Sequence, residues 1–414
     1  MNAAWVSLAA LAAAIVVGTV WRLNVGLLAF ALAYVVGVGV GDMKVSAVTA
    51  GFPTPLFAVL VAVTLLFAIA QVNGTLDTLA RHGVRLARGN RGLVPVVFFF
   101  LTAGLSTLGA GNIAAAALIA PLAMATAGRF GISAFLMTIM VANAANAGAY
   151  SPIAPTGLVA NELMARAGLP GFAWQTYWNT FFAQTIVAFA GYAVFGGWRL
   201  LRSGRGAVAT PMAEIAPFGR AQRLTLVVLG MVLVAVALFE VDVIAAAFVA
   251  VAVLSLGRAA DIEEAIRRVP WSTVLMVGGV STLVAVLQDT GGIDVIVDLL
   301  VRISTPETVT GSMAFVAGIV SAYSSTIGVV LPTFLPTVPD LAARLGADPL
   351  AIASSINVGG HLVDVSPLST IGALCVAAAP PTEDPRQLFN RVLAWGLSMA
   401  VVGAVVCWVF FGLL

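Results

Sequence analysis

The stretch SSINVGGHLVDVSPLSTIGA, residues 354–373, places two ionisable side chains inside an otherwise apolar segment. His361 is one of only two histidines in the chain, and Asp364 follows it by three residues. If the segment is helical, this spacing puts both side chains on one face. Ionisable groups inside a membrane span are rare and usually functional, so Asp364 is a candidate for cation coordination or proton carriage. A purely structural hydrogen bond between the pair is the alternative.

A second group of candidates consists of hydroxyl and amide side chains in segments that interrupt apolar runs. These segments are STLGAGNIAA around Asn112, SAYSSTIG around Ser325, and ANAANAGAYSPIAPTG at 142–157. Pro152 and Pro367 prevent regular helical hydrogen bonding where they stand. A helix interrupted in this way exposes free N–H groups at one end, which attract anions, and free carbonyls at the other, which can hold a sodium ion.

The elements that carry these residues must lie in a membrane. Of the 414 residues, 61% are hydrophobic and only 9% are charged, whereas a soluble domain has about 25% charged residues. The net charge of +2 and the lack of a basic tract argue against nucleic-acid binding, and the two cysteines have no metal-ligand spacing. No phosphate-binding loop of the GxxxxGK type is present, so ATP-driven pumping is not supported.

Apolar runs of about 20 residues, the length that crosses a bilayer, recur along the chain. Two stretches, about 92–127 and 309–337, are too long for one helix and are broken in the middle, so we expect each to be a re-entrant hairpin. We therefore predict an all-α polytopic membrane protein with ten transmembrane helices and two hairpins. The ten predicted spans are about 3–21, 24–41, 54–72, 133–160, 172–197, 223–239, 242–257, 271–287, 350–375 and 388–412.

The basic residues indicate the orientation. With the N-terminus outside, 16 of the 20 Lys and Arg residues fall in inside segments, and only Lys44, Arg166, Arg302 and Arg344 fall outside. Basic residues accumulate on the cytoplasmic side of membrane proteins. We therefore expect a multi-pass protein of the cell's inner (plasma) membrane with both termini on the outer side. The arginine-rich segment 81–91 is expected to lie on anionic membrane lipid.

The two halves of the sequence resemble each other. QVNGTLD at 71–77 matches QDTGGID at 288–294, and SPIAPTG at 151–157 matches SPLSTIG at 366–372. The broken centres of the two hairpins lie between these markers in both halves. Because each half contains five spans, the second half must enter the membrane from the opposite side, which is the inverted-repeat arrangement of secondary transporters. The predicted units are residues 1–197 as the first repeat, 198–222 as a cytoplasmic linker, and 223–414 as the second repeat, with broken helices at about 133–160 and 350–375.

These motifs resemble the ion-transporter superfamily, in particular the divalent anion/sodium symporters and, among them, the MatC-type dicarboxylate carriers. The resemblance covers most of the chain and is strongest in STLGAGNIAAAALIAP, NAGAYSPIAPTG, SAYSSTIGVVLP and GGHLVDVSPLSTIG. It implies sodium-coupled symport of a small dicarboxylate such as malonate or succinate, a homodimer, and an elevator motion. The family's Ser-Asn-Thr signature at each hairpin tip is only partly kept, as Gly111-Asn112-Ile113 and Ser324-Ser325-Thr326, which leaves monocarboxylates and the coupling stoichiometry open.

The predicted site residues form two overlapping sets, of which the first is carried over from the resemblance and the second also includes the ionisable residues of 354–373. The substrate contacts are expected at Asn112, Ser151, Pro152, Thr156, Ser324, Ser325, Thr326, Ser366, Pro367, Ser369 and Thr370. The coupling ion, Na⁺ or H⁺, is expected at Gly109, Gly111, Asn112, Asn146, Gly148, Ser321, Ser325, Gly360, His361 and Asp364. No cofactor other than this ion is expected.

Two other classes of function compete with anion transport. A cation/proton antiporter would use Asp364 alternately for a cation and a proton. An intramembrane enzyme would need more groups than His361 and Asp364, because an aspartyl protease requires two facing carboxylates and a metal site requires more His or Cys. A channel is disfavoured because midplane breaks in two inverted repeats are typical of alternating access. We therefore predict a non-enzymatic secondary transporter.

Overall fold

A computed structural model describes residues 2–21, 23–84, 90–202, 217–239, 241–380 and 382–413. All regular secondary structure in these ranges is helical, which confirms the predicted all-α class. Most of the linker predicted at 198–222 and the centre of the arginine-rich segment 81–91 lie outside the described residues.

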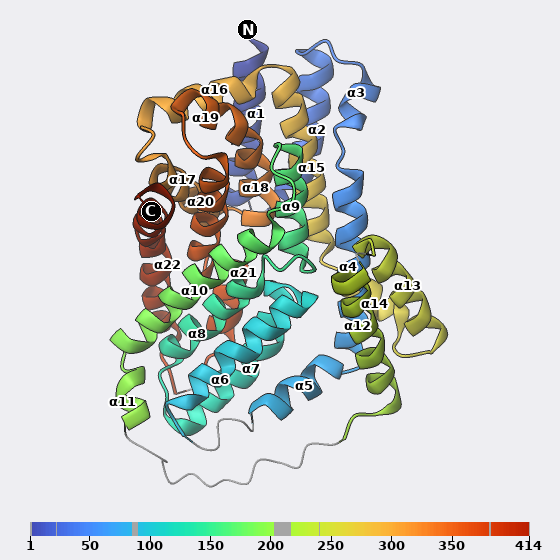
Figure 1. The fold of residues 1–414 in the computed structure, drawn as a ribbon, viewed down its shortest axis with the longest axis vertical. Coiled ribbons are helices and arrows are strands. Elements are labelled where there is room, and N and C mark those ends of the chain that lie inside the picture. Colours follow the sequence, from blue (N-terminus) through green and yellow to red (C-terminus); the bar gives the residue numbers. More distant parts are fainter. Residues whose placement is uncertain are drawn as a thin grey trace.

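The described residues of the first half form eleven α-helices, and a π-helical turn, Ser106–Ala110, follows α6. Figure 1 labels most of them in chain order. They are α1 Ala3–Val20, α2 Val25–Gly39, α3 Val45–Ala50, α4 Thr54–Val72, α5 Thr75–Val84, α6 Leu93–Leu105, α7 Asn112–Phe130, α8 Ala134–Gly148, α9 Pro155–Arg166, α10 Ala173–Val194 and α11 Gly197–Arg202.

The second half of the chain contains a further series of helices. A π-helical turn, Thr326–Val330, precedes α18, and a 3₁₀ turn, Val363–Val365, follows α20. The helices are α12 Arg220–Phe239, α13 Val243–Leu256, α14 Ile262–Arg268, α15 Trp271–Asp289, α16 Gly292–Ile303, α17 Val309–Tyr323, α18 Leu331–Phe334, α19 Val338–Leu345, α20 Pro349–Leu362, α21 Thr370–Ala377 and α22 Pro385–Cys407.

Seven of the described helical segments are long and apolar enough to cross a membrane. They are Thr54–Val72, Leu93–Ala110, Asn112–Phe130, Trp271–Asp289, Thr326–Leu345, Pro349–Ala377 and Pro385–Leu413. Five shorter apolar helices accompany them, among them α1, α2 and α8. The fold is thus that of a polytopic helical membrane protein, while the count of ten spans and two re-entrant hairpins stays a prediction.

Local sequence explains where the helices of the site region begin and end. The carboxylate of Asp348 accepts hydrogen bonds from the N–H groups of Leu350 and Ala351 at 3.1 Å each, which caps α20. Pro349 occupies the first turn, where no N–H is needed. At the other end of the molecule, Gly131 closes α7 with a left-handed backbone, φ 59°.

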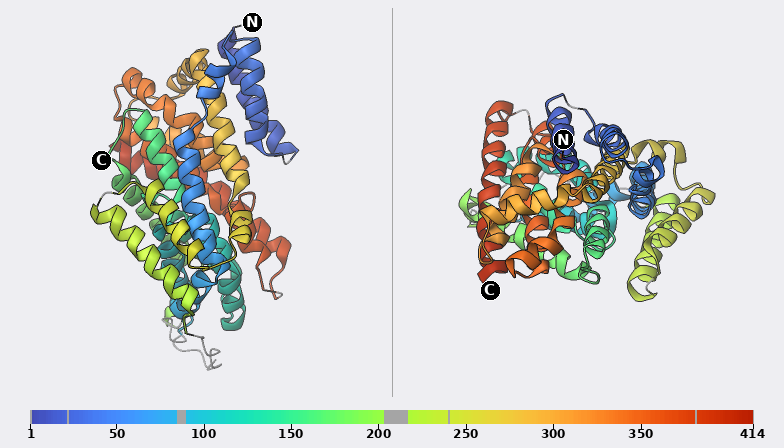
Figure 2. Two further views of the ribbon diagram at one scale, coloured as in Figure 1. Left: turned by 90° about the vertical axis from the view of Figure 1, so that its right-hand side faces the viewer. Right: turned by 90° about the horizontal axis from the view of Figure 1, so that it is seen from above.

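The described helices pack around two large hydrophobic cores and a smaller third one between α10, α17, α20 and α22. One large core joins α4, α6, α7 and α8 with residues of α21 and α22, and the other large core joins α1, α2, α15, α16 and the helices from α17 to α20. α2 packs along α15, and α13 packs along α4. In Figure 1, α5, α6 and α7 lie in the lower half and α16 and α19 at the upper end. Figure 2 shows α12 and α13 projecting from one side.

Both segments predicted to be broken helices consist of two helices joined by a short irregular stretch. α8 ends at Gly148 and α9 begins at Pro155, while α20 ends at Leu362 and α21 begins at Thr370. We call residues 149–154 the first break and residues 363–369 the second break. α8 and α20 contact each other, so the two breaks come together in the interior.

Candidate functional site

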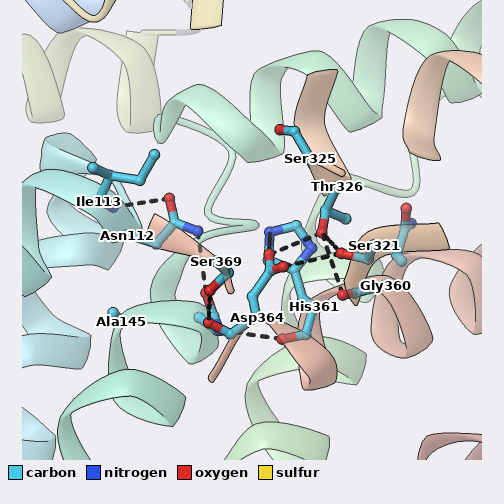
Figure 3. Close-up of polar contacts among 12 residues, drawn as sticks. Asn112, Ile113, Ala145, Ser321, Ser325, Thr326, Gly360, His361, Asp364 and Ser369 are labelled. Carbon is cyan, nitrogen blue, oxygen red and sulfur yellow. Dashed lines mark hydrogen bonds and ion pairs between the residues drawn. The ribbon is translucent and has the colours of Figure 1, made fainter. Parts of the chain in front are cut away.

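The carboxylate of Asp364 is the centre of the candidate site. It lies in the second break, on the 3₁₀ turn that follows α20. Ser321 Oγ donates to Asp364 Oδ1 at 2.9 Å, and Thr326 Oγ1 donates to Asp364 Oδ2 at 2.8 Å (Figure 3). Each carboxylate oxygen therefore receives one hydrogen bond from a neutral hydroxyl.

The two hydroxyls come from opposite sides of one tight turn. Ser321 lies in the last turn of α17, and Thr326 opens the π-helical turn that follows. We call residues 324–328, the turn between them and the start of the π-helical turn, tip 2. A Cβ atom on Gly360 would lie 2.7 Å from Thr326 Cγ2, so the approach of tip 2 to α20 requires a glycine there. This packing brings Thr326 Oγ1 within 3.2 Å of the Gly360 carbonyl.

Five oxygen atoms lie close together around the Asp364 carboxylate, and the two hydroxyl groups among them supply only two hydrogens. They belong to Ser321, Thr326, the Gly360 carbonyl and the Asp364 carboxylate, and the two hydroxyl oxygens are 2.6 Å apart. Carboxylate, hydroxyl and carbonyl oxygens are the ligands that hard cations prefer. The donor set therefore fits a sodium ion, and its carboxylate also fits a proton.

The turn between α6 and α7 is followed by an asparagine. Asn112 begins α7, and its Nδ2 donates to Asn146 Oδ1 at 3.1 Å. We call residues 109–112, this asparagine and the turn before it, tip 1. The turn contains two glycines with positive φ, Gly109 at 111° and Gly111 at 79°. Side chains other than glycine rarely adopt these angles, which explains why glycine stands at both positions.

Asn146 connects the two halves of the site. Its Oδ1 accepts from Asn112 of the first hairpin, and its Nδ2 donates to the carbonyl of His361 on α20 at 3.1 Å. The Asn146 side chain is fully buried. One amide group thus joins tip 1, the first broken helix and the second broken helix.

His361 lies beside Asp364, as their spacing predicts, but it does not hydrogen-bond to it. His361 Nε2 is 4.0 Å from Asp364 Oδ2, which is too long for a hydrogen bond. The other ring nitrogen, Nδ1, lies 2.9 Å from the hydroxyl of Tyr150, in the first break. Tyr150 is not among the site residues predicted from the sequence, although its position directly before the SPIAPTG motif could have suggested it.

Asp364 and His361 differ from the other ionisable residues in their burial. Among the Asp, Glu, Lys, Arg and His side chains in the described ranges, only these two belong to buried residues, with 9% and 1% of their surfaces exposed. A buried carboxylate without a cationic partner is unfavourable. In these ranges, Asp364 receives hydrogen bonds only from neutral groups, so the site would favour a cation.

The remaining predicted residues fall into three groups. The hydroxyls of Ser366 and Ser369 shape the second break, since Ser369 Oγ donates to the carbonyls of Asp364 and Ser366, and Ser366 Oγ accepts from the N–H of Leu368 at 3.2 Å. The second group consists of Gly148, Ser151 and Thr156 of the first broken helix and Pro367 of the second break, and all four are buried. Pro152 belongs to the same group and is half-buried.

The third group does not face the carboxylate. Ser324 Oγ donates to the Val320 carbonyl of its own helix at 2.6 Å. Ser325 Oγ accepts from the N–H of Gly328 at 3.1 Å and so caps the turn. Thr370 is exposed at the start of α21. The structure therefore groups Ser321, Thr326, Gly360, His361 and Asp364, and separately Asn112 and Asn146.

Comparisons with known proteins agree with this architecture. Residues 1–149 match the family model described as the N-terminus of the dicarboxylate carrier protein MatC. The structure is similar to that of the YdaH transporter of Alcanivorax borkumensis, with a TM-score of 0.60, 18% sequence identity, and coverage of 97% of this chain and 98% of that chain. No curated protein gave a significant match. Over residues 1–149 the chain is thus similar to the N-terminus of the MatC dicarboxylate carrier, and its fold is similar to that of a solved transporter.

Proposed function

We propose that this protein is a secondary active transporter of a small organic anion, specifically a C3 or C4 dicarboxylate such as malonate or succinate. The observation that carries the proposal is the meeting of two turns and two helix breaks in the interior. There, one set of hydrogen bonds links Asn112 and Asn146 to the His361 carbonyl, and a second set links Ser321 and Thr326 to Asp364. The match of residues 1–149 to a dicarboxylate carrier family supports the substrate class.

The anion would be held without a buried cationic side chain. No Lys or Arg is buried in the described ranges. α9 and α21 both begin at a break, and the free N–H groups at a helix N-terminus attract negative charge. The hydroxyl and amide groups of tip 1, tip 2 and the two breaks would supply the remaining contacts.

A cotransported cation would offset the charge of the substrate. The oxygen atoms around Asp364 are suited to Na⁺, and the carboxylate alone is suited to H⁺. We assign this coupling role to Asp364, with Ser321, Thr326 and Gly360 as the groups around the ion. The enzyme class is not proposed, because the described residues contain no group of three or more potential metal ligands and only one buried carboxylate.

The transport cycle would follow from an inverted repeat. Two pairs of similar contacts support such a repeat. In the first pair, α2 packs on α15 and α13 packs on α4, and in the second, α6 packs on α8 and α17 packs on α20. We propose that the hairpins and broken helices move as one unit against α4, α15 and their partners, in an elevator motion, within a homodimer in the inner membrane. Both termini would lie outside and residues 198–222 in the cytoplasm.

Uptake of radiolabelled succinate and malonate into proteoliposomes tests the proposal, with a sodium or a proton gradient imposed separately. Asp364→Asn is compared with Asp289→Asn, which changes an exposed acid at the end of α15. We expect gradient-driven uptake that Asp289→Asn leaves unchanged and Asp364→Asn reduces at least tenfold, because the amide cannot supply the negative charge.

The outcomes separate the parts of the proposal. Uptake that follows only one gradient identifies the coupling ion. Uptake of both substrates that survives Asp364→Asn at the wild-type rate would remove Asp364 from the coupling site. A folded protein that takes up neither substrate under either gradient would refute the dicarboxylate assignment.

A cation/proton antiporter is the second candidate, and the burial of Asp364 among neutral hydroxyls is the observation that favours it. It predicts sodium flux that needs an opposing proton gradient and no added anion. Anion-stimulated sodium flux would exclude it.

A further inference from the structure

The hydrogen bonds around Tyr150 determine which nitrogen of His361 carries the proton. Tyr150 Oη lies 3.1 Å from the carbonyl oxygen of Asn357 and 2.9 Å from His361 Nδ1. Tyr150 and Asn357 are fully buried, and His361 is 1% exposed. Polar atoms at such depth are nearly always hydrogen-bonded, so the assignment must satisfy both contacts.

Counting hydrogens leaves one arrangement that does so. A carbonyl oxygen only accepts, so the single hydroxyl hydrogen of Tyr150 goes to Asn357. Tyr150 Oη must then accept from His361, which requires a hydrogen on Nδ1. If Tyr150 instead donated to Nδ1, its oxygen would face the Asn357 carbonyl at 3.1 Å with no hydrogen between them, at the cost of one buried hydrogen bond.

A neutral imidazole with its hydrogen on Nδ1 has a bare lone pair on Nε2. Nε2 is the nitrogen that faces Asp364 Oδ2, at 4.0 Å. Two hydrogen-bond acceptors, His361 Nε2 and Asp364 Oδ2, therefore face each other. This explains why these two side chains, only three residues apart, remain beyond hydrogen-bond distance. The only donors that reach the carboxylate in the described ranges are the hydroxyls of Ser321 and Thr326.

We propose that Tyr150 is a positioning residue that holds His361 in the Nδ1–H tautomer and so prevents His361 from pairing with Asp364. The negative charge of Asp364 then remains available to the cotransported cation instead of being satisfied within the protein. Tyr150 lies in the first break and Asp364 in the second, so one half of the chain determines whether the carboxylate in the other half receives a hydrogen bond from His361. The functional part of this inference rests on the proposed function.

Removal of the Tyr150 hydroxyl should reverse the tautomer. In Tyr150→Phe, Nδ1–H loses the hydroxyl oxygen that accepts its hydrogen bond, whereas a hydrogen on Nε2 would face Asp364 Oδ2. His361 should change to the Nε2–H tautomer and donate to the carboxylate. A carboxylate that is already hydrogen-bonded by His361 should bind its cation more weakly.

Nitrogen-15 NMR of the full-length protein in nanodiscs tests the tautomer directly. The chain has two histidines, and His82→Gln removes the exposed one on α5, so that one labelled imidazole remains. We expect a directly bonded hydrogen on Nδ1 and none on Nε2, and the reverse in Tyr150→Phe. The control is Tyr192→Phe, which also removes a buried tyrosine hydroxyl, here bonded to the Gly92 carbonyl at 2.8 Å, and should leave the His361 signals unchanged.

The functional readout is the Na⁺ concentration that half-saturates succinate uptake. Tyr150→Phe should raise it about tenfold with little change in the maximal rate, and Tyr192→Phe should leave it unchanged. A hydrogen on Nε2 in the wild type would overturn the inference even if the Tyr150→Phe variant folds poorly. In a folded Tyr150→Phe protein, an unchanged tautomer would overturn it as well. If the tautomer behaves as expected but succinate is not transported with Na⁺, the proposed function fails and the positioning role of Tyr150 stands.

Discussion

At the scale of single residues, the site depends on how one buried carboxylate is satisfied. Asp364 has no cationic partner in the described ranges and is held by two hydroxyls, one on each oxygen. Hydrogen bonds to a charged group contribute more than those between neutral groups, typically about 1.5–3 kcal/mol. Ser321 and Thr326 should therefore influence cation binding more than most polar side chains in the chain.

Ser321→Ala and Thr326→Val each remove one of these hydroxyls without a large change in volume. We expect each variant to raise the half-saturating concentration of the coupling ion about tenfold, which corresponds to about 1.4 kcal/mol. The measurement is succinate uptake at graded ion concentrations.

The matched control is Ser355→Ala on α20, which removes a hydroxyl bonded only to the Ala351 carbonyl of its own helix. It should keep the wild-type value. Equal effects in all three variants would mean that general loss of packing, and not the carboxylate, accounts for the change.

At the scale of elements, the site depends on close contact between α17 and α20 and between α6 and α8. A Cβ atom on Gly359 of α20 would lie 2.3 Å from the Ala314 carbonyl oxygen of α17. A Cβ atom on Gly148 of α8 would lie 2.5 Å from the Ala103 carbonyl oxygen of α6. Both helix pairs thus make the same type of contact, and each contact depends on a glycine because the obstacle is backbone.

Gly359→Ala should separate α17 from α20. Overpacking of a tight interior typically costs about 1–3 kcal/mol, so we expect a lower unfolding temperature in detergent and weaker ion binding. Gly104→Ala on α6 is the control, because its Cβ would meet nothing within 4 Å.

Alanine favours the helix over glycine by up to about 1 kcal/mol, so Gly104→Ala should be neutral or slightly stabilising. A Gly359→Ala protein as stable as the wild type would show that α17 and α20 can separate without loss.

At the scale of the whole molecule, transport requires the site to move relative to the helices that hold it in the membrane. Tip 2 contacts α15 directly, since a Cβ atom on Gly328 would lie 2.5 Å from Met276 Sδ. α15 in turn packs along α2. If the hairpins move as proposed, this contact must break in each cycle.

A covalent link across that contact should stop transport. In Met276→Cys/Gly328→Cys, a thiol-specific cross-linker should abolish succinate uptake, and a reducible linker should restore it on reduction. The control pair is Gly128→Cys/Pro380→Cys, which joins α7 to the segment after α21, with a Cβ–Cβ distance of 3.0 Å.

Both positions of the control pair lie in the unit proposed to move, so its cross-linking should leave uptake largely intact. The native Cys375 and Cys407 are buried and should not react. Full uptake by the cross-linked Met276/Gly328 pair would exclude movement of tip 2 relative to α15.

Local chemistry made much of this structure predictable. The helical class follows from long apolar runs, since a chain in lipid must satisfy its backbone within each segment. The interruptions follow from Pro152, Pro367 and the glycines near them. The proximity of His361 to Asp364 follows from their spacing of three residues.

The sequence by itself therefore determined where helices form, where they stop, and which segments carry polar groups, because these depend on neighbouring residues. Only the tertiary structure decided which polar groups meet. Tyr150 and His361 are separated by 211 residues and Asn146 and His361 by 215, and Ser321 faces Asp364 while Ser324, three residues later, bonds to its own helix. Such choices depend on how helices distant in sequence pack against one another, and no local pattern encodes the direction in which a side chain then points.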